Sequence, residues 1–190
     1  MLIGVIVSVA LSSFGAFARE CDEIRGQVLR FHVLANSDSE EDQALKLRVR
    51  DAVLAGTANM PVFGGSKEEN AHGAAEHLAE HLDIIEKIAR TEIKAAGYTY
   101  EARAQIVNMY FETRDYSGVI MPAGRYDAVR LSIGAGEGEN WWCVMFPPMC
   151  IPAACDRQSL DLEEQIARLG TQPRYIPKFA IVEWIEQLLY

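Results

Sequence analysis

A histidine–glutamate–histidine string is the clearest candidate for metal chemistry in the sequence. His77, Glu80 and His81 stand in the order His-Leu-Ala-Glu-His, the pattern of inverted zinc proteases. On a helix the four-residue spacing puts both imidazoles on one face, where they could share a zinc ion. An apolar stripe through Leu78 and Leu82 explains the same register without a metal, and proteases of this kind need a distal carboxylate and a larger chain. We therefore expect no metal here.

A thiol nucleophile is the second chemical possibility. Cys143, His32 and Asn36 supply the residue types of a nucleophile, its base and an orienting amide. These residues are scattered along the chain, and Cys143 stands in a run expected to be buried or disulfide-bonded. Carboxylates are abundant, but their spacing singles out no pair for glycosidase chemistry. We expect neither a cofactor nor catalysis.

Glycine occupies every second position from Gly134 to Gly138, as in some phosphate-binding loops. Glu137 and Glu139 would repel a phosphate, and neither a lysine nor a helix start follows them. The pattern instead favours a glycine-rich hairpin.

The start of the chain has the pattern of a secretory signal. Residues 1–18 contain no Lys, Arg, Asp or Glu and end in Ala16-Phe17-Ala18, a small-x-small cleavage motif. The apolar run is short for a membrane anchor and contains serine and glycine. We expect cleavage after Ala18 and export, with an uncleaved anchor as the alternative. A basic segment ahead of the apolar run is missing, so either the start codon lies upstream or the terminal amine suffices.

The rest of the chain suits one acidic domain. The formal net charge of −9 opposes binding to nucleic acid or to an anionic lipid surface, both of which require a basic face. We expect residues 19–155 to form the core of an exported domain and residues 156–190 a helical extension packed on it.

Four cysteines make disulfides plausible in an exported chain. Pro147 and Pro148 would bend the chain between Cys143 and Cys150, which favours that pair and leaves Cys21 to Cys155 as the consequence. The alternative is that some of the four are small buried apolar residues.

The pattern of apolar residues predicts an α+β fold. Ser37 and Glu40 form a capping-box pattern before the first helix, Ser66 and Glu69 before the second, and Gly97 is placed to end the latter. We expect an antiparallel or mixed sheet of about four strands with helices on one side, in the order β-α-α-β-β-β-α. The expected segments are strand 27–35, helix 38–55, helix 66–97, strand 102–113, strand 127–133, turn 134–138, antiparallel strand 141–146, helix 159–169 and an apolar helix after Pro177.

Adjacent tryptophans mark the most distinctive segment of the chain. On a strand, Trp141 and Trp142 point to opposite faces, so one can enter the core while the other needs a second layer or a partner. Whether both are core residues or one belongs to a recognition surface stays open at this point.

Several long strings resemble the stage II sporulation protein R family. The match spans residues from about 27 to 150, the strings follow one another in the order expected for the family, and long strings of this kind are specific. They are Phe31–Asp38 (FHVLANSD), Asp42–Asp51 (DQALKLRVRD), Pro122–Tyr126 (PAGRY) and Gly136–Cys150 (GEGENWWCVMFPPMC).

The resemblance implies a signalling role without catalysis. Members of this family are made in the forespore and exported into the space between the two sporangial membranes. There they activate a membrane-embedded aspartic protease of the mother cell, which removes the inhibitory pro-sequence of the sigma E factor. The alternative from another class is an exported zinc- or thiol-dependent hydrolase acting on cell wall or peptide.

We expect the protein to contact the extracytoplasmic part of this protease through aromatic and arginine side chains, which dominate binding hot spots. The candidate residues form one patch at Trp141, Trp142, Phe146 and Arg125, and a second at His32, Asn36 and Asp38.

Overall fold

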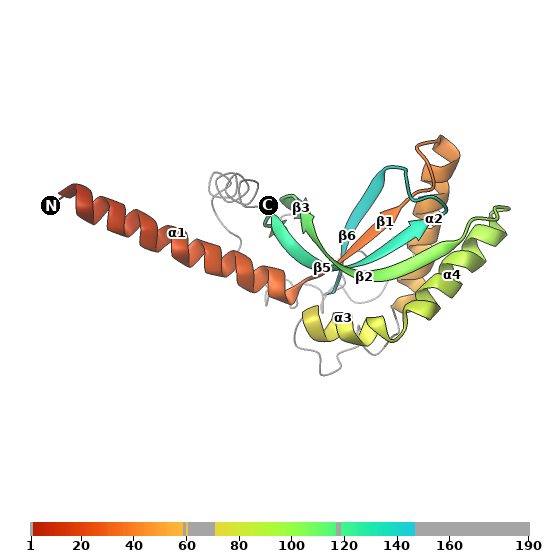
Figure 1. Cartoon of the computed structure of the whole chain (residues 1–190), viewed down its shortest axis with the longest axis horizontal. Coiled ribbons are helices and arrows are strands. Elements are labelled where there is room, and N and C mark those ends of the chain that lie inside the picture. The colour runs from red at the N-terminus through yellow and green to blue at the C-terminus, as the bar shows by residue number, and fades with distance from the viewer. Residues whose placement is uncertain (1, 59, 61–70, 117–118, 147–190) are drawn as a thin grey trace.

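The computed structural model of the chain describes residues 2–58, 60, 71–116 and 119–146 (Figure 1). The expected caps at Ser66 and Glu69 and the helices expected after residue 155 lie outside them. The elements are α1 (Leu2–Gln27), β1 (Leu29–Leu34), α2 (Glu40–Thr57), α3 (Ala71–Ala79), α4 (Leu82–Ala95), β2 (Ala102–Phe111), β3 (Arg114–Tyr116), β4 (Val119–Met121), β5 (Gly124–Ile133) and β6 (Asn140–Phe146).

Four of the strands form a mixed sheet in the order β2-β5-β1-β6. β1 lies between β5, to which it is parallel, and β6, to which it is antiparallel, while β2 is antiparallel to β5. Every residue of β1 is buried, Arg30 and His32 included, because the strand lies between two others and is covered on both faces. The expected α+β class, with a mixed sheet of about four strands and helices on one side, is confirmed.

Helices α2, α3 and α4 cover one face of the sheet. Alternate residues of β1, Phe31 and Val33, point into this layer. There they belong to one core with Val49 of α2, Leu78 of α3 and Ile85 of α4, all fully buried. Burying an aliphatic or aromatic side chain of this size stabilises a fold by roughly 1.5–3 kcal/mol, so this layer holds the sheet in place.

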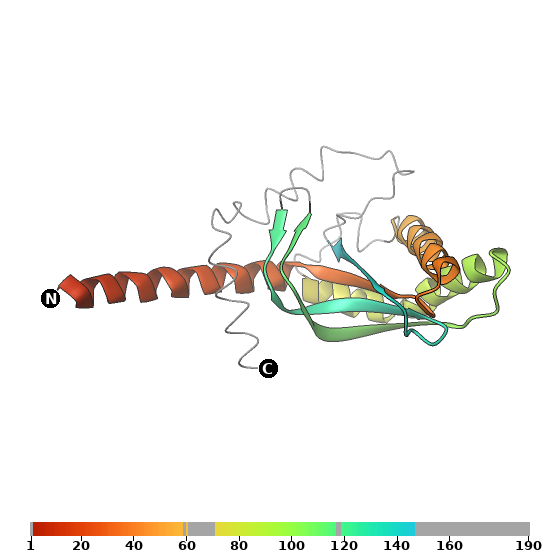
Figure 2. The ribbon, with the colours of Figure 1, turned by 90° about the horizontal axis from the view of Figure 1, so that it is seen from above.

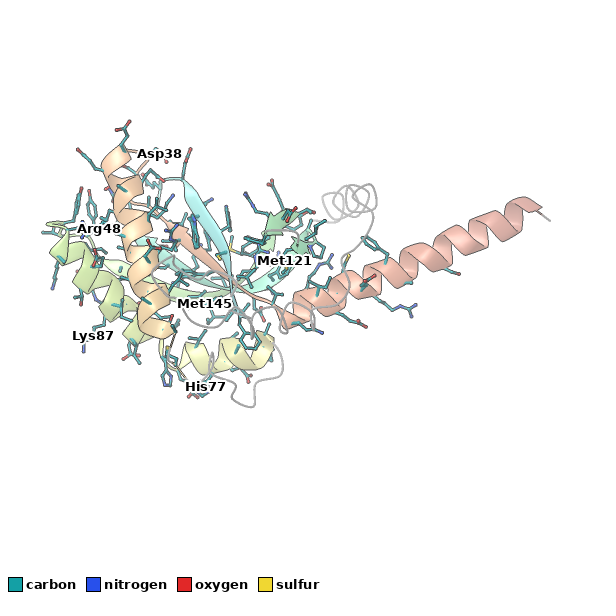
Figure 3. The ribbon with its side chains drawn as sticks, turned by 180° about the vertical axis from the view of Figure 1, so that it is seen from behind. Asp38, Arg48, His77, Lys87, Met121 and Met145 are labelled. Atoms are coloured by element: carbon teal, nitrogen blue, oxygen red, sulfur yellow. The ribbon has the colours of Figure 1, made fainter. Side chains whose placement is uncertain are left out.

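A second apolar cluster lies on the opposite face. It joins Ile24 of α1, Phe111 of β2, Met121 of β4 and Tyr126 of β5. Figure 3 labels Met121 in this cluster and Met145 in the helix-side core. The β3–β4 hairpin stands at the end of the sheet that α1 approaches (Figure 2).

Helix α1 projects away from the body in both Figures 1 and 2. Its later turns pack against the rest of the protein, with Phe17 and Cys21 buried beside Ile120 of β4. Gln27 therefore ends a helix, and the strand that we expected from this residue begins at Leu29. Among the described residues, no helix combines the length and the apolar character that a membrane span requires.

The N-cap of the first helix after β1 lies two residues later than the sequence pattern indicated. Ser39, not Ser37, is the N-cap of α2, and its Oγ accepts a hydrogen bond from the Asp42 backbone N–H at 3.2 Å. The three acidic residues that follow, Glu40, Glu41 and Asp42, then occupy the first turn, where the helix dipole favours them. Ser37 bonds the Asp42 carboxylate instead.

The long helix that we expected after residue 66 is divided in two. α3 ends at Ala79 and α4 begins after His81, whose backbone is not helical. The break lets α3 lie against β1 and β5 while α4 lies against α2 and β2, so the apolar stripe follows the sheet in two segments. Gly97, with a φ of 88°, ends α4 as expected, and Tyr98 N–H donates to Ile93 O at 3.1 Å.

The glycine-rich segment is a turn, but the hairpin that we expected there is wrong. β5 and β6 are not neighbours, because β1 is inserted between them. The connection therefore passes over the end of β1, where Gly138 N–H donates to Ala35 O at 3.0 Å and Glu137 N–H to Asn36 O at 3.3 Å.

Candidate functional site

The loop that connects β5 to β6, residues 134–139, passes over the end of β1, and we call it the crossing loop. The residues that follow β1 hold this crossing loop through their side chains. Asn36 donates from Nδ2 to Asp42 Oδ2 at 2.8 Å, and its Oδ1 accepts from Ala135 N–H at 2.9 Å. Asp38, labelled in Figure 3 at the start of α2, accepts from Glu139 N–H at 2.6 Å. Asn36 and Asp38, two residues of the second expected patch, thus stabilise the junction of β1, α2 and the loop.

The Asp42 carboxylate is the centre of this junction. It is buried and also accepts a 2.6 Å hydrogen bond from Ser37 Oγ. Burial alone would raise the pKa of Asp42, but hydrogen bonds from Ser37, Asn36 and Tyr100 outweigh it and hold the pKa below its ordinary value. The group therefore stays ionised at neutral pH, which suits an acceptor of hydrogen bonds and not a general acid.

The two tryptophans of β6 lie on opposite faces of the sheet, as the sequence predicts. Trp141 joins the helix side, where its ring meets Phe31 edge-on at 6.3 Å and the Arg50 guanidinium lies 4.7 Å from its centre. Trp142 lies on the other face and stacks on His32, with ring centroids 3.9 Å apart. Both tryptophans are half-buried, so each presents part of its ring to solvent.

His32 is almost fully enclosed beneath Trp142. Its Nε2 lies 3.0 Å from Asn140 Oδ1, to which a neutral ring can donate, and its buried Nδ1 has no partner among the described residues. Burial is the main reason that the pKa of His32 lies below its ordinary value, and the charge of Arg130 acts in the same direction. The ring is thus held neutral at physiological pH.

Arg30 is the residue that our sequence interpretation missed. It is fully buried on the same face, with its guanidinium 4.5 Å from the ring centre of Phe111, 5.2 Å from Tyr126 and 5.3 Å from Tyr116. Its Nη2 donates to the Tyr116 hydroxyl at 2.9 Å, while Nε and Nη1 have no partner in the described part of the chain. The signal in the sequence was an arginine inside a strand of otherwise apolar residues and one histidine.

The seven expected contact residues do not form the two patches that we inferred. Trp142, which we expected in the first patch, stacks on His32, which we expected in the second. Trp141 lies on the other face of the sheet. Phe146 pairs with Leu29 at the other end of β1. Arg125, on β5, donates to Asn108 Oδ1 at 2.8 Å.

The histidine string does not assemble a metal centre in the described residues. His77 lies on α3 and His81 lies in the break between α3 and α4, with ring centroids 5.4 Å apart. Figure 3 places His77 on α3, far from Asp38. Within the described ranges, no group of three His, Cys, Asp or Glu side chains is close enough to hold a metal ion.

The thiol hypothesis is contradicted by the register of β1 and β6. Cys143 pairs with Phe31 and belongs to the helix-side core, whereas His32 points to the opposite face. Cys143 is also in a disulfide, and its expected partner Cys150 lies outside the described residues. Cys21 is buried, and Cys155, the partner that we expected for it, lies outside the described residues.

The fold and these clusters define a small α+β protein with a two-sided mixed sheet, whose polar side chains at the strand ends hold loops. The family model for stage II sporulation protein R matches residues 25–156, which contain the whole sheet. The chain belongs to this family and therefore has a role in sporulation.

A curated relative gives the same assignment. The stage II sporulation protein R of Bacillus subtilis (strain 168) is 36% identical over 128 residues, which cover 67% of this chain and 55% of the relative. The chain thus matches about half the length of that protein. No solved structure matches this chain.

Proposed function

We propose that this protein is a secreted signal of endospore formation that activates a membrane-embedded aspartic protease and thereby leads to maturation of the mother-cell sigma E factor. The observation that carries the proposal is the family match over residues 25–156. The protein would leave the forespore through its N-terminal leader and meet the extracytoplasmic part of the protease in the space between the two membranes. It acts as a ligand and not as an enzyme.

A ligand activates such a protease only by binding its active form more tightly than its inactive form. A hundredfold shift of that equilibrium requires about 3 kcal/mol of differential binding. The half-buried tryptophans of β6 suit this task, because rings held by Arg50 and His32 lose little freedom on binding. We therefore propose Trp141 and Trp142 as contact residues, one for each face of the sheet.

The proposal is tested by producing the chain together with the protease and pro-sigma E in a host that does not sporulate. One version carries residues 1–18 and the other lacks them, so that only the first can be exported. We expect cleavage of pro-sigma E with the first version alone. Equal cleavage with the leaderless version contradicts action from outside the membrane, and no cleavage with either version contradicts activation.

A further inference from the structure

The sheet carries a net positive charge, whereas the chain as a whole carries a net negative charge. The chain has a net charge of −9, yet the four strands of the sheet contain four arginines and a single carboxylate. That carboxylate, Asp127, lies on the helix side, where its Oδ2 is 3.7 Å from His72 of α3. The other face of the four strands therefore bears no acidic residue.

Three of the arginines share that acid-free face. Arg30 and His32 of β1 pair with Ala128 and Arg130 of β5, and Arg103 of β2 pairs with Ser132, the position two residues beyond Arg130. Side chains two positions apart on a strand share a face, so Arg130 has Arg30 and Arg103 as diagonal neighbours. We call Arg30, Arg103 and Arg130 the arginine face.

The arginine face lacks carboxylate partners for its guanidinium groups among the described residues. Three of their nitrogens, Arg30 Nε, Arg30 Nη1 and Arg130 Nε, are buried and meet no hydrogen-bond acceptor in the part of the chain that the structure describes. Buried donors of this kind are costly until an acceptor reaches them, and neighbouring guanidinium groups repel one another. Arg103 is exposed and Arg130 half-buried, so an acceptor can reach the face from solvent.

We propose that the arginine face binds an acidic segment of a protein partner. Carboxylates of that segment would pair with Arg103 and Arg130, whose planar guanidinium groups suit bidentate contacts. Arg30 is fully buried and therefore contributes positive electrostatic potential to the face without contacting the segment directly. Trp142, stacked on the His32 that neighbours Arg130, offers an aromatic surface to the apolar part of the same segment.

A protein segment fits this face better than a membrane or a nucleic acid does. The arginine face is one patch of an otherwise acidic molecule, and an extended anionic surface would also meet the acidic remainder and be repelled by it. A short acidic segment meets the patch alone. The inference rests on the proposed function where it takes the segment to belong to the signalling partner, but its binding test is independent of that function.

The test is calorimetric titration of the purified full chain with a synthetic peptide in which glutamate alternates with valine. The control peptide has glutamine at every glutamate. We expect binding of the acidic peptide that weakens with added salt, and no binding of the control. Equal binding of the two peptides, or no binding of either, overturns the inference. So does binding to phosphatidylglycerol vesicles without binding to the acidic peptide.

Variants assign the binding to these side chains. Arg130→Gln is expected to weaken binding about tenfold, which corresponds to about 1.4 kcal/mol, and Arg130→Lys to weaken it less. Arg103→Gln changes an exposed residue and tests the face without a threat to folding. The matched control is Arg48→Gln on α2, a residue paired with Glu92 in the helix layer (Figure 3).

The outcomes separate this inference from the proposed function. Unchanged affinity in both Arg103→Gln and Arg130→Gln, with normal circular dichroism, overturns the arginine face as the binding site. If the acidic peptide fails to bind while the chain still promotes pro-sigma E cleavage, the inference fails and the proposed function stands. If the acidic peptide binds but the chain does not promote pro-sigma E cleavage, the inference stands and the proposed function fails.

Discussion

Buried polar side chains on β1 and in the loop after it govern how the protein responds to pH and to mutation. His32 is held neutral under Trp142, while Asp42 is held ionised by Ser37 and Asn36. Both shifts act in the same direction on stability. In each case the unfolded state binds protons more readily than the folded state, so acidification favours unfolding.

The substitution His32→Gln tests the first of these effects. The folded-state pKa of His32 lies below its ordinary value of about 6.5. The wild-type protein therefore loses free energy of unfolding as the pH falls below about 6.5, until the folded-state pKa is passed. We expect the variant to lose less over that range, measured by urea denaturation at several pH values.

The control for this experiment is Gln105→Asn, a change at an exposed residue of β2 that adds and removes no titratable group. It is expected to retain the wild-type dependence of stability on pH. If His32→Gln also retains it, the account of a buried neutral imidazole is wrong.

Asn36→Ala tests the junction between β1, α2 and the crossing loop. The substitution removes one hydrogen bond to Asp42 and one from Ala135, and leaves a buried carboxylate with fewer donors. We expect the free energy of unfolding to fall by roughly 2 kcal/mol. Glu40→Gln, an exposed change in the first turn of α2, is the control and should cost less than about 1 kcal/mol. Equal effects of the two would contradict a structural role for Asn36.

The sequence predicted the position of individual side chains correctly where strand geometry alone determines the direction in which they point. That Trp141 and Trp142 point to opposite faces follows from strand geometry, and the structure confirms it. The stacking of Trp142 on His32 and the rings around Arg30 could not be predicted, because they depend on which strands are neighbours. Alternation along one strand carries no information about the pairing of strands.

At the scale of elements, the crossing loop is the feature that sets the order of the strands. It passes over the end of β1 so closely that a Cβ at Gly138 would collide with the backbone carbonyl of Ser37. The sequence indicated the turn and both flanking strands, but the insertion of β1 between them is a long-range pairing that glycine spacing does not reveal. The break between α3 and α4 was missed for a similar reason, since the apolar stripe continues across it.

Gly138→Ala is therefore expected to be more damaging than an ordinary glycine substitution. Because the neighbouring atoms are backbone, the loop or β1 must shift, and we expect a loss of about 2 kcal/mol or more in the free energy of unfolding. A Cβ added at Gly26 of α1 has no atom of the described residues within 4 Å, so Gly26→Ala should be neutral or stabilise the helix by up to about 1 kcal/mol. Thermal denaturation of the two variants compares them directly. A Gly138→Ala protein as stable as wild type would show that the close approach to Ser37 is wrong.

At the scale of the whole molecule, the sheet presents two chemically different sides. One is closed by α2, α3 and α4 over an apolar core, and the other carries the second apolar cluster and the arginine face. The net negative charge predicted that the protein avoids nucleic acids and anionic lipids, yet it did not reveal a cationic patch, because composition averages over faces that folding separates.

The central claim, that this protein activates the sigma E processing protease, is tested most directly by adding the purified protein to membranes that contain the protease and pro-sigma E. The measurement is the rate of pro-sigma E cleavage as a function of protein concentration. The account predicts a rate that rises with concentration and saturates, as a ligand that stabilises the active form requires. A rate that does not depend on the added protein, whether high or zero, would contradict it.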